Sequence, residues 1–411
     1  MKILLINYDF PPNPGIGGRR WAKLAKYLAL KGHQLFVVKA ELPQTTSIST
    51  WEKDVSHPNI QVYSAARKYP RALSHPKEGW VGKIKFHAQK RLMQWREKGT
   101  IYDQSIGWQK TMFPICRSFL QNEKIDAIIA TGAPWNLLVY AAQLKMEFPH
   151  VRLLADYRDP WLTAKNYGMA ALKNARMNAE IKKQQFVFEH VDVVTTPYEY
   201  LTAELKSWSE QRCKNQPSFV TLPHFFDDED FQFENAHHQT NDFFRVVYAG
   251  DIYVGSEPEW KQFQTMIESL EHTLPSHTQV RFDIYTHAKM PTFISGMKSV
   301  HLHAPIGKDI FQVMNNADAL LIVLPENKKN ERTTKFFEYL PLRKPILIVA
   351  PAGEATSFVE SNHLGVHSHL AQDGLRSFFT GEFTRKTFNA TFPIETHTAN
   401  SRADEVIELL S

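Results

Sequence analysis

The chain has 411 residues, of which 43% are hydrophobic and 22% charged, and a formal net charge of +5. At roughly 100–200 residues per domain, this length predicts two or three domains, and the composition is that of globular proteins. No stretch approaches the roughly 18 uninterrupted apolar residues of a membrane span, and two cysteines, Cys116 and Cys213, are too few for a disulfide framework and match no zinc spacing.

The chain begins with the apolar run "KILLIN" (2–7), which is too short for a secretory segment and reads as a first strand, so we expect a cytoplasmic protein. The loop "NYDFPPNPGIGGRR" follows and leads into a helix. Gly17 and Gly18 permit close backbone approach, and the helix N-terminus with Arg19 favours an anion. The loop is therefore a candidate ligand loop, with a flexible connection as the alternative.

A basic segment lies at 67–98, where ten Lys or Arg residues stand against only two Glu. Within it, apolar residues recur at helical spacing: Trp80, Ile84, Ala88, Leu92 and Trp95. A basic amphipathic helix with tryptophans suits an anionic membrane surface, which would place the protein at the inner face of the cell membrane. The alternative is a surface helix that these apolar residues dock on its own domain.

Short apolar runs rich in Ile, Val and Leu alternate with helical patterns along the rest of the chain. Such runs are typical of strands buried on both faces of a parallel sheet, and their alternation with helices predicts βαβ units. The runs are "KILLIN", "QLFVVK", "DAIIA", "VRLLA" and "VDVVTT" in the first half, then "FRVVYAG", "VRFDIYT", "ADALLIVL" and "PILIVA" in the second.

The stretch 225–242 is acidic, polar and without periodicity, so we interpret it as a linker. It separates a domain at 1–224, with the basic segment as an insertion, from a domain at 243–395. The prediction is an α/β protein with two Rossmann-like, doubly wound parallel-sheet domains facing a cleft. Ligands of open α/β sheets bind at the carboxyl ends of the strands.

Two strands of the first domain end in polar loops. "LLADYRDPW" carries Asp156, Arg158, Asp159 and Trp161 beyond a buried strand, and these could bind sugar hydroxyls or align a base. The alternative is an Asp–Arg pair that caps the following segment. "IIATGAPWN" ends another strand and brings Asn136, either as part of a pocket wall or as a simple turn.

In the second domain, "NERTTKFFEYLPLRKPILIVAP" predicts a short helix and then a buried strand. Thr333 and Thr334 stand where an N-cap would, and Lys335 lies in the first turn, where a lysine opposes the helix dipole. A bound diphosphate would offset that conflict, and Glu338 could accept two hydrogen bonds from a ribose diol. The alternative is a surface ion pair at i, i+3.

Metal and nucleic-acid sites are not predicted. The acidic run at 228–230 lies in the linker and reads as solvated, and His301 and His303 lack a third ligand. Aromatic residues do not interleave with Lys and Arg outside the basic helix.

Taken in order, several motifs resemble those of GT-B glycosyltransferases of the family 4 type. The resemblance covers nearly the whole chain and is carried by "PPNPGIGGRRWAKLAKYLALKGH", "TGAPW", "ADYRDPW", "TLPHFFDDEDF", "VVYAGDIY" and, most specifically, "TTKFFEYLPLRKPILI". It implies two Rossmann-like domains around a cleft, a nucleotide-sugar as substrate, no cofactor and no metal. Family members usually retain the anomeric configuration.

The resemblance also implies roles for individual residues. Lys335 would contact the donor diphosphate and Glu338 the ribose, while the stretch 156–159 would face the reacting sugar or the acceptor. The last helix, in 396–411, would cross back to the first domain. Further donor-side residues would be Thr333, Thr334, Gly250, Gly17 and Gly18, catalytic candidates are Asp159, Asp156 and Arg158, and acceptor-side candidates are Arg19, Asn136 and Trp161.

Three positions depart from the family pattern. The first of two glutamates eight residues apart falls on Asn330, Asp251 stands where many members have an Arg, and His224 replaces a usual Asn. Arg332 and Lys261 are candidate substitutes for the missing Arg.

The expected function is transfer of a sugar from a nucleotide-sugar donor to a glycan or lipid-linked acceptor in bacterial surface polysaccharide synthesis. Three alternatives stay open: a sugar-nucleotide epimerase on a similar fold, a non-catalytic nucleotide-sugar- or glycan-binding scaffold, and a membrane-surface partner protein built on the basic segment.

Overall fold

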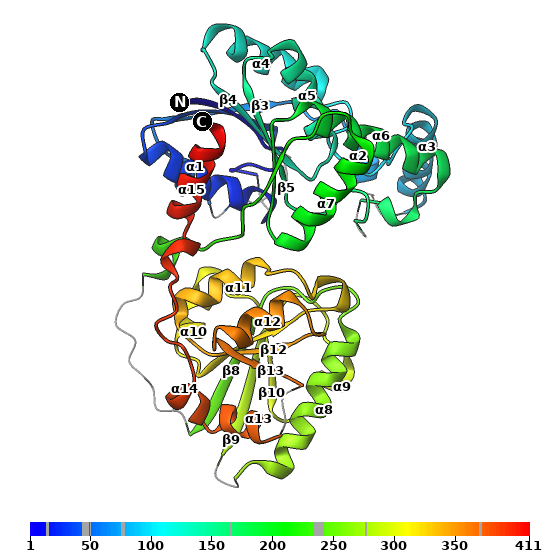
Figure 1. Cartoon of the computed structure of the whole chain (residues 1–411). Coiled ribbons are helices and arrows are strands. Elements are labelled where there is room, and N and C mark those ends of the chain that lie inside the picture. Colours follow the sequence, from blue (N-terminus) through cyan, green and yellow to red (C-terminus); the bar gives the residue numbers. More distant parts are fainter. Residues whose placement is uncertain are drawn as a thin grey trace. The chain divides into compact units, whose positions relative to one another are not determined.

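In the computed structural model the described residues are 1–13, 16–42, 49, 51–74, 79–164, 167–232, 242–275, 278–369 and 372–411. They form two compact units. Unit 1 comprises Met1–Pro223 and Ala399–Ser411, and unit 2 comprises His224–Thr398 (Figure 1). Half of the predicted linker, residues 233–241, lies outside the described residues.

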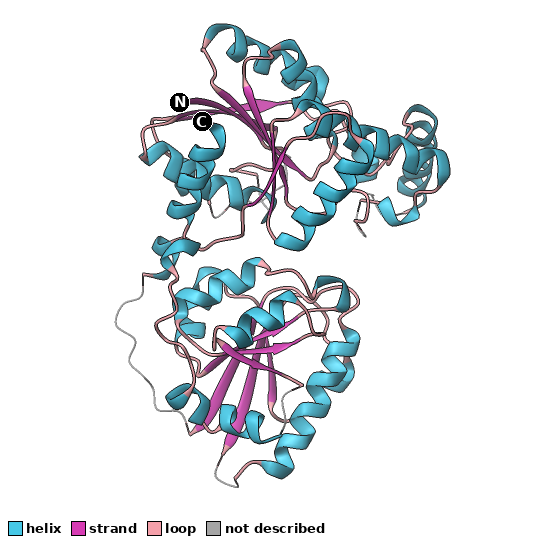
Figure 2. Cartoon of the chain, viewed as in Figure 1, coloured by secondary structure: helices cyan, strands magenta, loops and turns pink. Residues whose placement is uncertain are grey.

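The sheet of unit 1 has seven strands, all parallel, in the order β3-β2-β1-β4-β5-β6-β7 (Figure 2). The strands are β1 (Lys2–Ile6), β2 (Gln34–Ala40), β3 (Ile60–Ala65), β4 (Ala127–Gly132), β5 (Arg152–Tyr157), β6 (Val193–Thr196) and β7 (Ser218–Thr221).

Helices cover both faces of this sheet, as the apolar runs predict. Leu4 and Ile6 face the core that α5 closes, and side chains one residue along the strand point to the opposite face, where α1 packs. The helices of unit 1 are α1 (Arg19–Leu30), α2 (Arg71–Ser74), α3 (Trp80–Arg96), α4 (Gln109–Asn122), α5 (Asn136–Glu147), α6 (Asn174–His190), α7 (Glu199–Arg212) and α15 (Ala399–Leu410).

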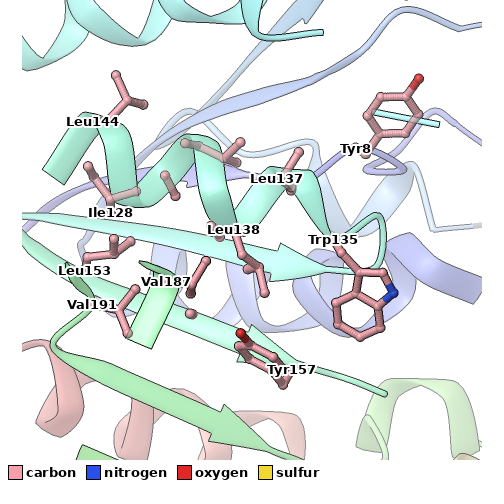
Figure 3. Close-up of a cluster of buried hydrophobic side chains, with 14 of the residues drawn as sticks. Tyr8, Ile128, Trp135, Leu137, Leu138, Leu144, Leu153, Tyr157, Val187 and Val191 are labelled. Atoms are coloured by element: carbon pink, nitrogen blue, oxygen red, sulfur yellow. The ribbon is translucent and has the colours of Figure 1, made fainter. Parts of the chain in front are cut away.

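Large aromatic residues close the core of unit 1 near the strand ends. Trp135 and Tyr157 are fully buried with ring centroids 5.9 Å apart, and Trp161 stacks on Trp135 at 5.5 Å (Figure 3). Offset and edge-on ring contacts of this kind add to the free energy gained by burying the rings. The loops that follow β4 and β5 are thereby held on a rigid base.

The sheet of unit 2 has six parallel strands in the order β10-β9-β8-β11-β12-β13. The predicted pair of doubly wound parallel sheets is therefore confirmed. The strands are β8 (Phe243–Ala249), β9 (Gln279–Tyr285), β10 (Val300–His303), β11 (Ala319–Val323), β12 (Ile346–Val349) and β13 (Gly365–His367).

Two buried clusters lie on the two faces of this second sheet. Trp260 of α8 and Phe378 of α13 belong to one cluster, and Phe336 and Phe337 of α11 belong to the other. The helices of unit 2 are α8 (Glu257–Thr273), α9 (Thr292–Ser295), α10 (Ile310–Asn315), α11 (Thr334–Tyr339), α12 (Glu354–Ser361), α13 (Gln372–Phe379) and α14 (Glu382–Lys386).

The chain passes between the units twice, and the two passages are tied together. Phe226 pairs with Thr398 as a parallel bridge, and the Phe226 amide donates to the His397 carbonyl at 3.1 Å. The last helix, α15, belongs to unit 1, where it packs on α1, and the Arg152 guanidinium donates to the Leu409 carbonyl at 2.7 Å.

Within the described ranges, none of the helices has the length and apolar character needed to cross a lipid bilayer.

Candidate functional site

Each sheet has one point where the strand order reverses, and the predicted site residues gather at these points. In unit 1 the chain runs from β1 outward through β2 and β3 and then returns to the other side of β1 with β4. In unit 2 the reversal lies between β8 and β11. Loops that leave the carboxyl ends of such neighbouring strands diverge, and ligands of open α/β sheets bind there.

Asp156, a catalytic candidate, is fully buried at the end of β5. Its carboxylate accepts hydrogen bonds from Arg20 Nε at 3.2 Å and from the Trp21 indole at 2.7 Å, both on α1. The hydroxyls of Thr131 and Thr195, its partners on β4 and β6, lie at 3.3 and 2.9 Å. With no exposed surface, Asp156 acts by anchoring α1 to the sheet.

Arg158 joins the two loops at the reversal point of unit 1. Its guanidinium donates to the carbonyls of Gly132 at 3.0 Å and Ala133 at 2.7 Å, beyond β4, and to the Gly17 carbonyl at 2.6 Å, beyond β1. Three guanidinium donors thus bind backbone oxygens, so Arg158 holds the loops after β1 and β4 in a fixed arrangement.

Asp9 lies next to this guanidinium and was not predicted as a site residue. A Cβ at Gly17 would lie 3.1 Å from an Arg158 nitrogen and 3.4 Å from an Asp9 carboxylate oxygen. Burial raises the pKa of Asp9, while the positive charges of Arg158 and Arg67 oppose that rise. No hydrogen bond to its carboxylate is found among the described residues. A half-buried carboxylate of this kind is suited to accept a proton or a hydroxyl hydrogen bond.

The remaining candidates of unit 1 divide by exposure. Asp159 is exposed. Burial raises the pKa of the Tyr167 phenol, the charges of Asp159 and Asp9 raise it further and that of Arg158 lowers it, so these groups lie in one neighbourhood. Trp161 has no exposed surface, and its indole donates to Glu180 at 2.9 Å. Contact between an acceptor and the Trp161 ring is therefore not available in this structure.

Asn136 and Arg19 lie at the starts of two helices. The backbone amide of Asn136, at the beginning of α5, donates to the buried Asp103 carboxylate at 2.8 Å. Arg19 opens α1 and is mostly buried. Both therefore lie in the wall of the site and present little surface to a ligand.

Gly17 and Gly18 have different reasons to be glycine. A Cβ on Gly18 would lie 2.2 Å from the Asp9 carbonyl oxygen, so close packing of backbone on backbone requires glycine there. At Gly17 the nearest atoms are the ends of side chains. Of the two, only Gly17 lies against the charged groups of the candidate site.

In unit 2, Lys335 lies in the first turn of α11 and its amine points to the loop beyond β8. Nζ donates to the Tyr248 hydroxyl at 2.6 Å and to the Asp251 carbonyl at 3.1 Å, and it lies 4.0 Å from the Tyr248 ring centroid. Burial lowers the pKa of Lys335 to about 7, against the opposing effects of the Glu338 and Asp251 charges. Among the described residues both hydrogen-bond partners of the amine are neutral acceptors, so no carboxylate is bonded to it.

Gly250 and Lys335 are matched to one another. Gly250 has φ +115°, where other residues are strained, and a Cβ there would lie 2.6 Å from Lys335 Cε. The predicted motifs "VVYAGDIY" and "TTKFFEY" therefore meet at the reversal point between β8 and β11. Asp251 contributes its backbone carbonyl to this contact, and the charge of its side chain also acts on Lys335.

The other donor-side candidates surround this lysine. Glu338 is half-buried on the next turn of α11, and its charge is felt by Lys335 and by the half-buried Tyr253 phenol. Thr333 is the residue that precedes α11 and its side chain makes no capping bond, and Thr334 opens the helix. The sequence correctly places Lys335 and Glu338 on one short helix, with Thr333 and Thr334 at its start.

Two departures from the family pattern have structural consequences. The Asn330 side chain accepts from the Glu354 amide at 3.1 Å, at the start of α12, so this position stabilises a helix end. The His224 ring packs against Phe337 of α11 at 6.3 Å. The candidate substitutes are also engaged. Arg332 pairs with Glu354 at 3.2 Å, and Lys261 pairs with Glu257 at 3.6 Å.

The sequence did not point to three residues that lie near the two reversal points: Asp9, Tyr248 and Tyr253. Asp9 follows the buried run "KILLIN", so the argument that selected Asp156 at a strand's carboxyl end would also have found it. Tyr248 reads as a core residue within "FRVVYAG", because only the structure shows that its hydroxyl reaches the amine of Lys335.

No protein-family model and no curated protein matches the sequence. Solved structures match its whole length. Sucrose-phosphate synthase from Thermosynechococcus elongatus superposes with a TM-score of 0.61 at 11% identity, covering 100% of this chain and 98% of that one. WaaG, a glycosyltransferase involved in lipopolysaccharide biosynthesis, gives 0.55 at 13% identity, with 100% and 99% covered.

A third match is a putative UDP-N-acetylglucosamine 2-epimerase from Listeria monocytogenes. Its TM-score is 0.50 at 10% identity, with 99% of this chain and 94% of that one covered. At such identities the likeness concerns the fold. The two all-parallel α/β units have the fold of GT-B glycosyltransferases.

Proposed function

We propose that this protein is a glycosyltransferase that moves a sugar from a nucleotide-sugar donor to a glycan or lipid-linked acceptor in bacterial surface polysaccharide synthesis. The donor binds unit 2 at Lys335, and the acceptor binds unit 1 near Asp9 and Asp159. We further propose that transfer retains the anomeric configuration and needs no metal ion. One structural neighbour that shares the fold is a glycosyltransferase of lipopolysaccharide biosynthesis.

The observation that carries this proposal is the position of the Lys335 amine. It lies at the point of unit 2 where ligands of doubly wound sheets bind, with Gly250 leaving room for it and only neutral acceptors bonded to it. A nucleoside diphosphate supplies the anion that this half-buried amine lacks. Glu338, one turn further along α11, is placed to accept hydrogen bonds from a ribose diol.

This arrangement suits a reaction in which negative charge develops on the leaving group. As the bond between the sugar and the diphosphate breaks, charge accumulates on the phosphate oxygen, and a prepositioned ammonium stabilises it. Lys335 has a pKa of about 7 without ligand, so diphosphate binding draws it into the charged state. In unit 1 the Asp9 carboxylate accepts a hydrogen bond from the attacking hydroxyl and orients it. As the hydroxyl oxygen bonds to the anomeric carbon, its proton passes to an oxygen of the leaving diphosphate.

The test is a thermal-shift screen of the full chain against UDP, GDP, ADP and their sugar derivatives, since a ligand that binds only the folded state raises the melting temperature. We expect one nucleoside diphosphate series to stabilise the protein. Lys335→Met should weaken its binding about 10–100-fold, because a charge-assisted contact is lost. Lys386→Met, at an exposed lysine of α14, is the control and should leave binding unchanged. Equal affinity of Lys335→Met and the native protein would refute the assignment.

The epimerase alternative shares the fold and is separated by its products. An epimerase converts a nucleotide-sugar without any acceptor, whereas a glycosyltransferase releases the nucleoside diphosphate. Incubation of the stabilising nucleotide-sugar with the protein alone, followed by NMR of the sugar, distinguishes them. A new sugar isomer that is still attached to the nucleotide would establish the epimerase, and nucleotide release would establish transfer or slow hydrolysis.

The scaffold alternative draws on Asn330, which stabilises the start of α12 where the family often has a glutamate. A scaffold binds the nucleotide-sugar but leaves it intact. Nucleotide release above the rate in buffer, abolished by Lys335→Met, would exclude it.

A further inference from the structure

The apolar residues that the sequence analysis found on the basic helix do not dock it to unit 1. Helix α3 (Trp80–Arg96) exposes every one of them: Trp80, Ile84, Ala88, Leu92 and Trp95. The side chains of Trp80 and Trp95 are 74% and 84% exposed. The alternative of local docking through these residues is therefore wrong.

A different face holds α3 in place. Gly82 and Met93 are buried on this helix, and Phe86 packs against the small cluster that contains Met93. The Gln89 side chain accepts from the Ala72 amide at 3.1 Å. Because four docking positions recur at helical spacing, the orientation of the helix about its axis is determined.

The end of α3 is anchored as well. Arg176 of α6 donates to the carbonyl of Glu97 at 3.1 Å and of Gly99 at 2.8 Å, and it also contacts the Gln94 carbonyl. A rigidly held helix thus presents its other face to solvent.

The exposed apolar face lies nearly opposite the docking face. At about 100° per residue, Trp80, Ile84 and Leu92 lie on a stripe whose centre is roughly 150° from that of the docking residues. Among the described residues, five of the thirteen exposed large hydrophobic side chains belong to this one helix. Both tryptophans that are exposed in the described ranges are on it. Single exposed apolar residues are normal, but a contiguous stripe indicates an interaction surface.

Basic residues border the stripe on both sides. Lys85 and Arg96 lie along one border and Lys83 along the other, at the same angular spacing, while Arg91 lies between Trp80 and Ile84. All four basic residues are exposed. The helix carries five Lys or Arg and no acidic residue. A binding partner of this face therefore needs apolar groups against the stripe and negatively charged groups against the basic residues.

We propose that α3 is an interfacial helix that binds this protein to the surface of an anionic lipid bilayer. The tryptophan rings and the aliphatic side chains of Ile84 and Leu92 enter the boundary between headgroups and acyl chains, and the Lys and Arg side chains lie among the lipid phosphates. The helix lies in the plane of the membrane. This proposal goes beyond the proposed function and does not depend on it.

Other occupants fit the observed chemistry less well. A second copy of this chain would bring five like charges against five, which repel. A nucleic acid would satisfy the charges, yet it offers no apolar layer for Ile84 and Leu92. A bilayer supplies both components in the order that the helix presents them.

Co-sedimentation of the full chain with vesicles tests this proposal. We expect binding to vesicles of phosphatidylcholine with phosphatidylglycerol and at least about tenfold weaker binding to phosphatidylcholine alone. Binding should decrease with added salt, because the phosphate contacts are screened. Replacing both exposed tryptophans, Trp80→Ser with Trp95→Ser, should weaken binding about tenfold or more. These positions are exposed, so the melting temperature should stay unchanged.

Matched variants control for the loss of apolar surface and of charge. Tyr200→Ser with Val254→Ser removes two exposed apolar side chains away from α3 and should leave vesicle binding intact. Lys83→Ser with Lys85→Ser should weaken it, whereas Lys110→Ser with Lys206→Ser, which removes the same charge elsewhere, should not. Equal binding to both vesicle types would overturn the proposal, as would full binding by the double tryptophan variant. Concentration-dependent self-association that the tryptophan variant abolishes would identify a second copy as the occupant instead.

Discussion

At the reversal point of the first sheet, Arg158 donates to three backbone carbonyls, whereas at the corresponding point of the second sheet Lys335 donates to one hydroxyl and one carbonyl. The arginine holds two loops in a fixed arrangement and leaves the neighbouring Asp9 as the group able to react. The lysine holds no loops together and keeps an amine whose pKa lies near 7. The same position in two similar sheets thus holds a structural arginine in unit 1 and, in the function proposed above, a ligand-binding lysine in unit 2.

The largest expected effect is on stability, at the buried ion pair of Asp156 and Arg20 in unit 1. Asp156→Ala leaves the buried guanidinium of Arg20 without its carboxylate and should lower the free energy of unfolding by about 3–5 kcal/mol. Denaturant unfolding followed by tryptophan fluorescence measures it. Asp159→Ala, at an exposed position three residues away, is the control and should change stability by less than about 0.5 kcal/mol.

If Asp156→Ala does not fold, Asp156→Asn keeps the side-chain volume and isolates the charge. A change of less than about 1 kcal/mol in the free energy of unfolding of that variant would contradict a structural role for charge at the reversal point of unit 1.

The second effect concerns Asp9. Asp9→Asn should reduce the rate of sugar transfer about 100-fold while leaving stability and donor binding unchanged, since the variant loses the carboxylate that accepts the hydroxyl hydrogen bond. Initial rates of nucleotide release with acceptor present measure it. Asp404→Asn, on the exposed side of α15, serves as the control. A native rate in Asp9→Asn would place the reactive group of unit 1 elsewhere.

The third prediction sharpens the link between Gly250 and Lys335. Gly250→Ala should destabilise unit 2 by about 2 kcal/mol, because φ is positive there, and should also weaken nucleoside diphosphate binding, because its Cβ displaces the lysine. Gly255 also has positive φ but no atom within 4 Å of an added Cβ. Gly255→Ala therefore reproduces the strain without the displacement. If both variants bind the nucleotide equally, the contact with Lys335 has no role in the site.

The smallest expected effect is on pH dependence. Lys335 has a pKa of about 7 when free, and a bound diphosphate favours the charged amine. Nucleoside diphosphate affinity should therefore fall up to about tenfold per pH unit above pH 7, as the free amine loses its proton. Calorimetry across this range measures it. Lys335→Arg keeps the charge at all these pH values and should flatten the profile, and a flat profile in the native protein would contradict the buried, titrating amine.

The interior strands of both sheets could be predicted from the sequence, and the edge strands could not. All nine predicted runs form strands, and none of them is an edge strand. The edge strands β3, β7 and β10 face solvent along much of their length, and β13 has only three residues. Their sequences therefore lack the continuous apolar run that burial on both faces produces.

The candidate site was predictable in position more than in role. The sequence placed Arg158 just beyond a buried strand and Lys335 and Glu338 on a short helix, and the structure has them at the end of β5 and on α11. Roles depend on exposure and partners, which the sequence does not carry. Asp156 and Asp159 are three residues apart with the same side chain, yet one has no exposed surface and the other is in solvent.

The path of the chain makes unit 2 an insertion into unit 1, attached covalently at both of its ends. Unit 2 is one continuous segment, 224–398, whereas unit 1 also includes the thirteen residues that follow unit 2. A truncation before Ala399 would therefore remove α15, which packs on α1, and would expose apolar surface on unit 1 although the deleted residues follow unit 2 in the sequence. Limited proteolysis near the tied passages at Phe226 and Thr398 would in the same way release unit 2 only after two cuts.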